Sequence, residues 1–224
     1  MKPHLKLAET LTPDGARLTL HSHDRSFCIR INGQDLMHSA TACSELQLGE
    51  LAMEGLAGKP ARVLIGGLGL GFTLKAVLEK AAPDLSLDIA ELLPAVVEWN
   101  RTFLSGLNGA LLADPRVNVL VEDVGPVLSR AVAQPYDAIL LDIDNGPTAM
   151  VQATNSGHYR AQGIQRIAHA VKPGGRVAIW SARPDHAFER RLAQAGFAVK
   201  SVPAKLYATA RKTTYTIYLA DKKT

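Results

Sequence analysis

Residues 61–74 read ARVLIGGLGLGFTL, and this stretch decides the fold. The run Ala61–Ile65 is short and mostly apolar, as in a buried strand, and six residues with four glycines follow it directly before a helical pattern. Glycines at such a turn let the backbone bend sharply and let a ligand approach where a β-carbon would clash. We therefore expect a nucleotide or nucleoside to bind at Gly66, Gly67, Gly69 and Gly71, although a tightly packed turn would show the same pattern.

From this stretch onward, short apolar runs alternate with helical periods. The predicted strands are Ala61–Ile65, Leu85–Ala90, Val117–Val121, Asp137–Leu141 and Arg176–Trp180. The predicted helical faces between them carry Leu74, Val77, Leu78 and Ala81, then Val96, Asn100, Phe103 and Leu107, then Ile164, Ile167, Ala168 and Val171. Strands that are apolar throughout and separated by amphipathic helices indicate an α/β protein with a doubly wound, mostly parallel sheet.

The end of this pattern departs from it. Phe197–Val202 and Thr214–Ala220 read as strands with no helical period between them, which predicts an antiparallel pair at one edge. With five strands before it, this pair gives a seven-stranded Rossmann-like sheet that resembles the methyltransferase fold. Before the pair, Gly174-Gly175 follows the third helical period and is expected to supply the left-handed residue that ends that helix.

The first 45 residues form a different unit. Arg17–Leu20 and Ser26–Ile31 are rich in strand formers, and Asn32-Gly33 separates the second run from Gln34–Met37. Asn-Gly between two such runs is a strong β-hairpin signal, because it favours positive φ at both turn positions. We predict a β-hairpin appendage over residues 1–45 and a catalytic domain over residues 46–224.

Composition excludes several classes of protein. Of the 224 residues, 47% are hydrophobic and 21% are charged, values that rule out a disordered chain, a collagen-like repeat and a disulfide scaffold. No apolar run approaches the roughly 20 residues that a membrane span requires. The first ten residues lack the apolar core of a secretory signal, and two cysteines suit a reducing compartment. We expect a cytoplasmic protein that does not bind membranes.

The net charge of +4 does not indicate a nucleic-acid-binding protein. From Lys200 onward there are six Lys or Arg residues and one acid, Asp221. A solvated C-terminus accounts for this excess as well as a nucleic-acid patch does, and no basic-aromatic stripe accompanies it. We therefore expect no nucleic-acid partner.

Two acidic positions extend the expected nucleoside site. Glu91 ends the second predicted strand about 20 residues beyond the glycines, where a carboxylate accepts hydrogen bonds from ribose hydroxyls in doubly wound folds. Asp123 follows the third strand beside Glu122; it is the better candidate to accept from an adenine amino group while the N–H of Val124 donates to the ring. A helix N-cap at Asp123 is compatible with that role. The spacing between the glycine loop and Glu91 also fits a dinucleotide-binding site, so it does not identify the cofactor.

A third acidic position follows the fourth strand, where the chain reads YDAILLDIDNGP over residues 136–147. Asp142 lies at the carboxyl edge of the sheet, where open α/β sheets place their sites, and Asp144 follows two residues later. These carboxylates would hold an amine substrate and accept its proton, because an alkylammonium is unreactive until it is deprotonated. The alternatives are a capped, solvated loop and a metal site; no His or Cys accompanies them at metal-ligand spacing, so we expect no metal.

These motifs resemble those of the spermidine/spermine synthase family, the aminopropyltransferases with the class I methyltransferase fold. The similar stretches are residues 62–74, the segment AELLPAVV at 90–97, the loop 136–147 and the N-terminal hairpin with Ser44-Glu45 after it. The resemblance implies that Glu91 binds the ribose of the donor, Asp123 binds its adenine, and Asp142 activates the attacking amine. It further implies a homodimer. Asp144 matches the second loop acid of the family if one residue is deleted.

Two departures from the family leave the donor and acceptor open. Leu70 stands where the family has an aspartate that binds the donor's amino group, and Ser44 to Glu54 has no clear counterpart of the family's polyamine-binding Tyr-Gln and His. We expect aminopropyl transfer from decarboxylated S-adenosylmethionine to a small amine. The alternatives are methyl transfer from S-adenosylmethionine to an unidentified acceptor, and a non-catalytic module that binds a nucleoside or a polyamine.

Overall fold

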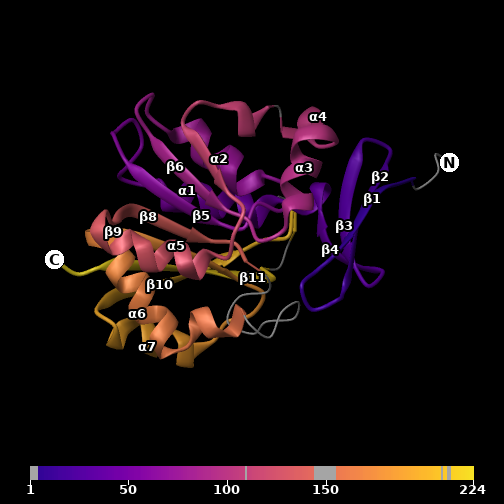
Figure 1. Cartoon of the computed structure of the whole chain (residues 1–224). Coiled ribbons are helices and arrows are strands. Elements are labelled where there is room, and N and C mark those ends of the chain that lie inside the picture. Colours follow the sequence, from indigo (N-terminus) through magenta and orange to yellow (C-terminus); the bar gives the residue numbers. More distant parts are fainter. Residues whose placement is uncertain (1–4, 109, 144–154, 208, 211–212) are drawn as a thin grey trace.

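The computed structural model describes residues 5–108, 110–143, 155–207, 209–210 and 213–224. It contains two sheets, a four-stranded antiparallel sheet near the N-terminus and a seven-stranded sheet that has helices on both faces. Figure 1 shows the small sheet beside one end of the large one.

The N-terminal sheet joins consecutive strands in the order β1-β2-β3-β4, all antiparallel. These are β1 (Leu5–Leu11), β2 (Arg17–His23), β3 (Ser26–Ile31) and β4 (Gln34–His38). Asn32 and Gly33, with φ of 48° and 83°, form the turn between β3 and β4, so the predicted hairpin is confirmed. The sheet adds β1, which the sequence pattern did not reveal. The division of the chain at residue 45 stays a prediction.

The large sheet has the order β10-β11-β9-β8-β5-β6-β7, which confirms the predicted seven-stranded fold. Its strands are β5 (Arg62–Gly66), β6 (Ser86–Ala90), β7 (Val117–Leu120), β8 (Tyr136–Leu141), β9 (Val171–Ser181), β10 (Phe197–Ala204) and β11 (Tyr215–Lys222). Strands β5 to β9 pair in parallel, and β11 pairs antiparallel with both β9 and β10. The predicted antiparallel pair therefore lies at one edge of the sheet.

Two groups of helices cover the two faces of this sheet. One core cluster joins α1 (Cys43–Ala52), α2 (Phe72–Lys80) and α3 (Pro94–Thr102) to alternate residues of the strands and to the inner face of the N-terminal sheet. The other joins α5 (Val124–Arg130), α6 (Ala161–Ala170) and α7 (His186–Gln194) to the intervening strand residues. The short α4 (Ser105–Asn108) follows α3. None of the helices in the described residues is long and apolar enough to cross a bilayer.

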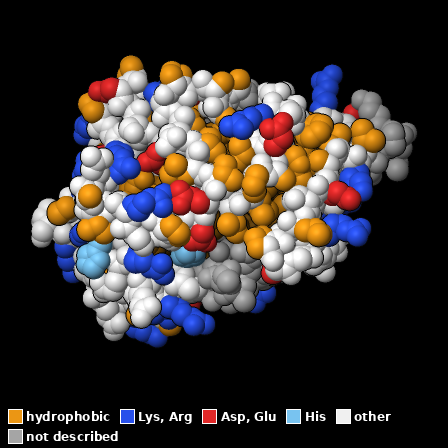
Figure 2. All heavy atoms as spheres, viewed as in Figure 1, with side chains coloured by type: hydrophobic (Ala, Val, Ile, Leu, Met, Phe, Trp, Pro, Cys, Tyr) orange, Lys and Arg blue, Asp and Glu red, His pale blue; other side chains and the backbone are white. Residues whose placement is uncertain are grey.

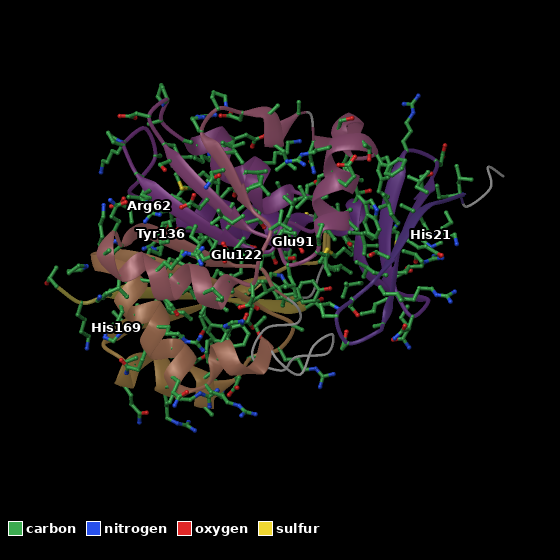
Figure 3. All side chains as sticks on the ribbon, in the orientation of Figure 1. His21, Arg62, Glu91, Glu122, Tyr136 and His169 are labelled. Atoms are coloured by element: carbon green, nitrogen blue, oxygen red, sulfur yellow. The ribbon has the colours of Figure 1, made fainter. Side chains whose placement is uncertain are left out.

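The order of the strands positions the site. The chain builds the sheet outward from β5 through β6 to β7, and then crosses back to place β8 on the other side of β5. Ligands of open α/β sheets bind at this switch point, beyond the carboxyl ends of the strands. In Figure 3, Arg62 and Tyr136 lie at the starts of β5 and β8, while Glu91 lies toward the N-terminal sheet. The carboxyl edge of the large sheet therefore faces the small sheet.

Two predicted details are wrong. The sequence pattern predicts Phe103 on one helical face with Val96 and Asn100, but α3 ends at Thr102 and Phe103 is 38% exposed. The helix before Gly174-Gly175 ends earlier than predicted, at Ala170, and its C-cap Val171 is extended. Gly174, with φ of 74°, makes a bend within β9 instead of capping the helix, because β9 already pairs with β8 at Val171.

The contact between α1 and α2 depends on Gly49. A β-carbon at this position would lie 2.6 Å from the β-carbon of Ala76 and 3.0 Å from the carbonyl oxygen of Thr73. We expect Gly49→Ala to lower the free energy of unfolding by about 1–3 kcal/mol, because overpacking must separate the two helices. Urea unfolding monitored by circular dichroism measures this change in the free energy of unfolding.

The matched control is Gly106→Ala. A β-carbon at Gly106 has no atom within 4 Å, so this substitution is expected to be neutral or slightly stabilising. Equal unfolding midpoints for the two variants would contradict the close approach of α1 and α2.

Candidate active site

The glycine-rich loop connects β5 to α2 at the switch point. Gly67 and Gly71 adopt φ of 90° and 83°, and Gly71 is the N-cap of α2. The N–H of Gly67 donates to the carbonyl oxygen of Ala90 at 2.9 Å, and a β-carbon at Gly67 would collide with the backbone carbonyl of Asp142. The loop thus brings the ends of β5, β6 and β8 together in one place.

A cleft lies between this loop and the N-terminal sheet. Gly67 and Gly69 line it, and so do four carboxylates, Glu91, Glu122, Asp123 and Asp142. The opposite wall is apolar and comes largely from the small sheet, through Leu18, Ile29, Leu36 and Met37. Figure 2 shows hydrophobic side chains gathered at this junction. Glu91 and Glu122, which are labelled in Figure 3, both line this cleft.

The structure brings most of the predicted site residues together. Gly67, Gly69, Glu91, Asp123, Val124 and Asp142 all line the cleft. Gly66 and Gly71 lie outside its lining: Gly66 packs between Val124 and Leu141, and Gly71 lies against two asparagine side chains of α3 and α4. Asp144 lies outside the described residues.

Glu91 is buried, and its carboxylate holds the glycine loop. Its two oxygens accept hydrogen bonds from the N–H groups of Leu68 and Leu93, each at 2.9 Å. Burial raises the pKa of Glu91, while the hydrogen bonds from the backbone oppose that shift. Since each carboxylate oxygen accepts more than one hydrogen bond, Glu91 can hold the loop and still accept from a ligand hydroxyl.

Asp123 lies at the rim of the cleft and is the N-cap of α5, accepting from the N–H of Gly125 at 2.7 Å. Its other oxygen lies 3.4 Å from Nε2 of the buried His158, in the short helix Asn155–Tyr159. The hydrogen bond with His158 is the largest cause that lowers the pKa of Asp123. This carboxylate is therefore anionic and fixed in direction.

Asp142 follows β8 and is half-buried. The Thr73 hydroxyl, on α2, donates to its Oδ2 at 2.6 Å, and its backbone N–H donates to the carbonyl oxygen of Gly66 at 2.8 Å. Burial raises the pKa of Asp142 to about 6, although the hydrogen bond from Thr73 acts in the opposite direction. A carboxylate whose pKa lies close to neutrality is suited to accept a proton.

Glu45 is a functional candidate that sequence reasoning did not assign. It lies in the first turn of α1, and its Oε2 accepts from the Ser44 hydroxyl at 2.5 Å. Burial and the charge of Asp142 raise its pKa to about 7. No sequence signal pairs Glu45 with Asp142, because packing of α1 on α2 and the sheet creates their proximity.

The arrangement is suited to cationic ligands. Glu91, Asp123 and Asp142 lie at the ends of three different strands, and all three face one cleft. Carboxylates in a partly buried cleft stabilise cations through charge-assisted hydrogen bonds, and those with raised pKa values can accept protons. The chemistry that this site supports is therefore the binding of a cation followed by proton removal.

Comparison of the sequence with known proteins finds relatives among enzymes of polyamines. The chain is 33% identical over 120 residues to putrescine N-methyltransferase 2 of Nicotiana attenuata and 30% identical over 124 residues to polyamine aminopropyltransferase of Mycobacterium tuberculosis. These alignments cover 53% and 54% of this chain but only 30% and 23% of the relatives. No family model matches the chain.

Solved structures share the fold over nearly the whole chain. Spermidine synthase from Thermotoga maritima has a TM-score of 0.75 at 16% identity, over 97% of this chain and 72% of that one. A spermidine synthase bound to the transition-state analogue AdoDATO gives a TM-score of 0.74 at 17% identity, over 98% of this chain and 72% of that one. Human methyltransferase-like protein 13 in complex with SAH gives a TM-score of 0.59 at 19% identity, over 81% of this chain and 80% of that one. The chain is thus related in sequence to a polyamine aminopropyltransferase and to putrescine N-methyltransferases, and it has the fold of the spermidine synthases, as the resemblance predicted.

Proposed function

We propose that this protein transfers an aminopropyl group from decarboxylated S-adenosylmethionine to an amine acceptor. The observation that carries the proposal is the chemistry of the cleft: its charged lining residues among those described are all acids. Both substrates are cations, since the donor is a sulfonium with a terminal ammonium and the acceptor is an ammonium. The α-carboxylate of S-adenosylmethionine would meet only like charge there, which favours the decarboxylated donor.

The site residues predicted from the sequence that line the cleft each have a role in this proposal. The backbone at Gly67 and Gly69 allows close approach of the nucleoside. Glu91 accepts from the ribose hydroxyls, and Asp123 accepts from the adenine amino group while Val124 donates to the ring. Asp142 takes a proton from the acceptor amine, and Asp144 is its proposed partner by resemblance alone.

The reaction requires little covalent help from the protein, because the sulfonium is already activated. The ammonium gives one proton to a carboxylate, and the nitrogen lone pair attacks the propyl carbon bonded to sulfur. The C–S bond breaks, its electron pair stays on sulfur, and methylthioadenosine leaves. Positioning and removal of the proton therefore supply most of the rate enhancement.

Methyl transfer to an amine is the second candidate. Leu70 is buried in the glycine loop and offers no carboxylate to a donor ammonium, and the relatives include putrescine N-methyltransferases. The same base would serve this reaction, because the acceptor nitrogen must lose a proton in either case.

Calorimetry with both donors, followed by mass detection of products with putrescine, separates these functions. Aminopropyl transfer predicts heat with the decarboxylated donor and release of methylthioadenosine. Binding of the carboxylated donor alone, with a methylated product, would favour the second candidate. Binding without turnover of any acceptor would contradict both and favour a binding module.

We expect Asp142→Asn to keep donor affinity within a few fold while turnover falls by about 10² or more, because the variant retains shape but loses the base. Steady-state kinetics and calorimetry measure the two effects. The control is Asp84→Asn, a substitution of an exposed residue outside the cleft lining, which should change neither. An equal loss of binding and turnover would make Asp142 a structural residue.

A homodimer and a cytoplasmic location belong to the same proposal and stay predictions. Both derive from the sequence, through the family resemblance and the cysteine content. Sedimentation of the purified protein tests the first, and fractionation of cells that produce it tests the second.

A further inference from the structure

A second half-buried carboxylate, that of Glu45, interacts with the proposed base. Glu45 in α1 and Asp142 after β8 interact through their charges, and α2 lies against both. The Thr73 hydroxyl of α2 donates to Oδ2 of Asp142 and lies 3.4 Å from the backbone carbonyl oxygen of Glu45. Gly49, which allows α1 and α2 to approach closely, lies one helical turn beyond Glu45. The packing of α1 on α2 therefore places the Thr73 hydroxyl between the backbone of Glu45 and the carboxylate of Asp142.

In the part of the chain that the structure describes, no cationic side chain acts on the Glu45 carboxylate. The charge of Asp142 acts on Glu45, and Tyr215, at the start of β11, has its pKa raised by burial and by the charge of Glu45. The Ser44 hydroxyl donates to Oε2 of Glu45, and the Thr73 hydroxyl reaches the backbone carbonyl oxygen of Glu45. Two carboxylates that share such a site do not both ionise readily, so the pair loses its last proton only near neutral pH, and the fully ionised pair can then accept one proton.

We propose that Glu45 and Asp142 work as one proton-sharing pair, and that Glu45 receives the proton that Asp142 takes from the acceptor amine. This inference rests on the proposed function. The acceptor enters as R–NH₃⁺ and gives one proton to Asp142, which passes it to the Glu45 carboxylate. The nitrogen then attacks the donor and the C–S bond breaks. The products are a secondary ammonium, neutral methylthioadenosine and one proton on Glu45, which is released to solvent before the next turnover.

A pair of carboxylates explains how a half-buried base can work next to two cations. With a single carboxylate, protonation by the amine would leave the site without negative charge while the sulfonium is still present. With two, one carboxylate remains ionised after the proton is taken, and it keeps stabilising the donor until the C–S bond breaks. Glu45 is thus a positioning and proton-accepting residue that acts through Asp142.

The kinetic test is the pH dependence of turnover in Glu45→Gln, which keeps the volume of the side chain and its acceptor for Ser44. In the unaltered protein we expect the acid limb of kcat to fall near pH 7, where the pair loses its last proton. In Glu45→Gln the limb should move to lower pH by about one unit, and the plateau should fall at least about tenfold, with donor affinity unchanged within threefold.

Two comparison variants sharpen this test. Glu50→Gln changes an exposed glutamate of the same helix and should leave the profile unchanged. Glu45→Asp retains the charge and should restore part of the plateau. An unshifted acid limb in Glu45→Gln, or a change confined to KM for the amine, would overturn the proposal.

A second measurement does not depend on turnover. Nuclear magnetic resonance titration of ¹³C-labelled glutamate carboxyls, with Glu45 assigned by its absence from Glu45→Gln, should give a midpoint near 7. That midpoint should fall by at least one pH unit in Asp142→Asn, because the like charge is removed. A midpoint near 4.5, or one that Asp142→Asn does not move, rejects the proton-sharing pair. If the titration shows the pair but neither donor gives a product with any amine, the proposed function fails instead.

Discussion

The structure depends on one close approach of backbone to backbone, where the chain leaves β5 and returns at the end of β8. Gly67 lies directly against the backbone carbonyl of Asp142, and the N–H of Asp142 donates to the carbonyl oxygen of Gly66 at 2.8 Å. No side chain fits between these strands at that point. The loop that would receive the nucleoside and the carboxylate that would act on the amine are therefore fixed relative to each other by the sheet itself.

The carboxylates around this point are chemically different because their partners differ. Glu91 accepts hydrogen bonds from two backbone N–H groups in a buried position, Asp123 is paired with His158, and the charge of Asp142 acts on Glu45. These settings lower the pKa of Asp123 and raise the pKa of the other three. Carboxylates thus provide both an anion of fixed direction for recognition and a group whose pKa lies near neutrality for proton transfer.

The N-terminal sheet completes the cleft. Its inner face contributes Leu18, Ile29 and Met37, and Met37 packs so closely on Gly69 that a β-carbon there would lie 2.7 Å from its sulfur. An apolar wall opposite a row of carboxylates lowers the local dielectric constant and strengthens every charge interaction in the cleft. The small sheet therefore contributes to the electrostatics of the site as well as to its shape.

The sequence by itself determined the order of the strands and helices, the hairpin at Asn32-Gly33 and the acids at the ends of three strands, because these are local signals of periodicity, turn chemistry and position after a strand. It did not reveal β1, whose pairing depends on β2, or the exposure of Phe103, which depends on where α3 stops. Only the tertiary structure decided that Glu45 lies beside Asp142, that Thr73 donates to a carboxylate 69 residues away, and that Gly66 and Gly71 support the loop without lining the cleft. Contacts of this kind arise when helices pack on a sheet, and no spacing within the chain encodes them.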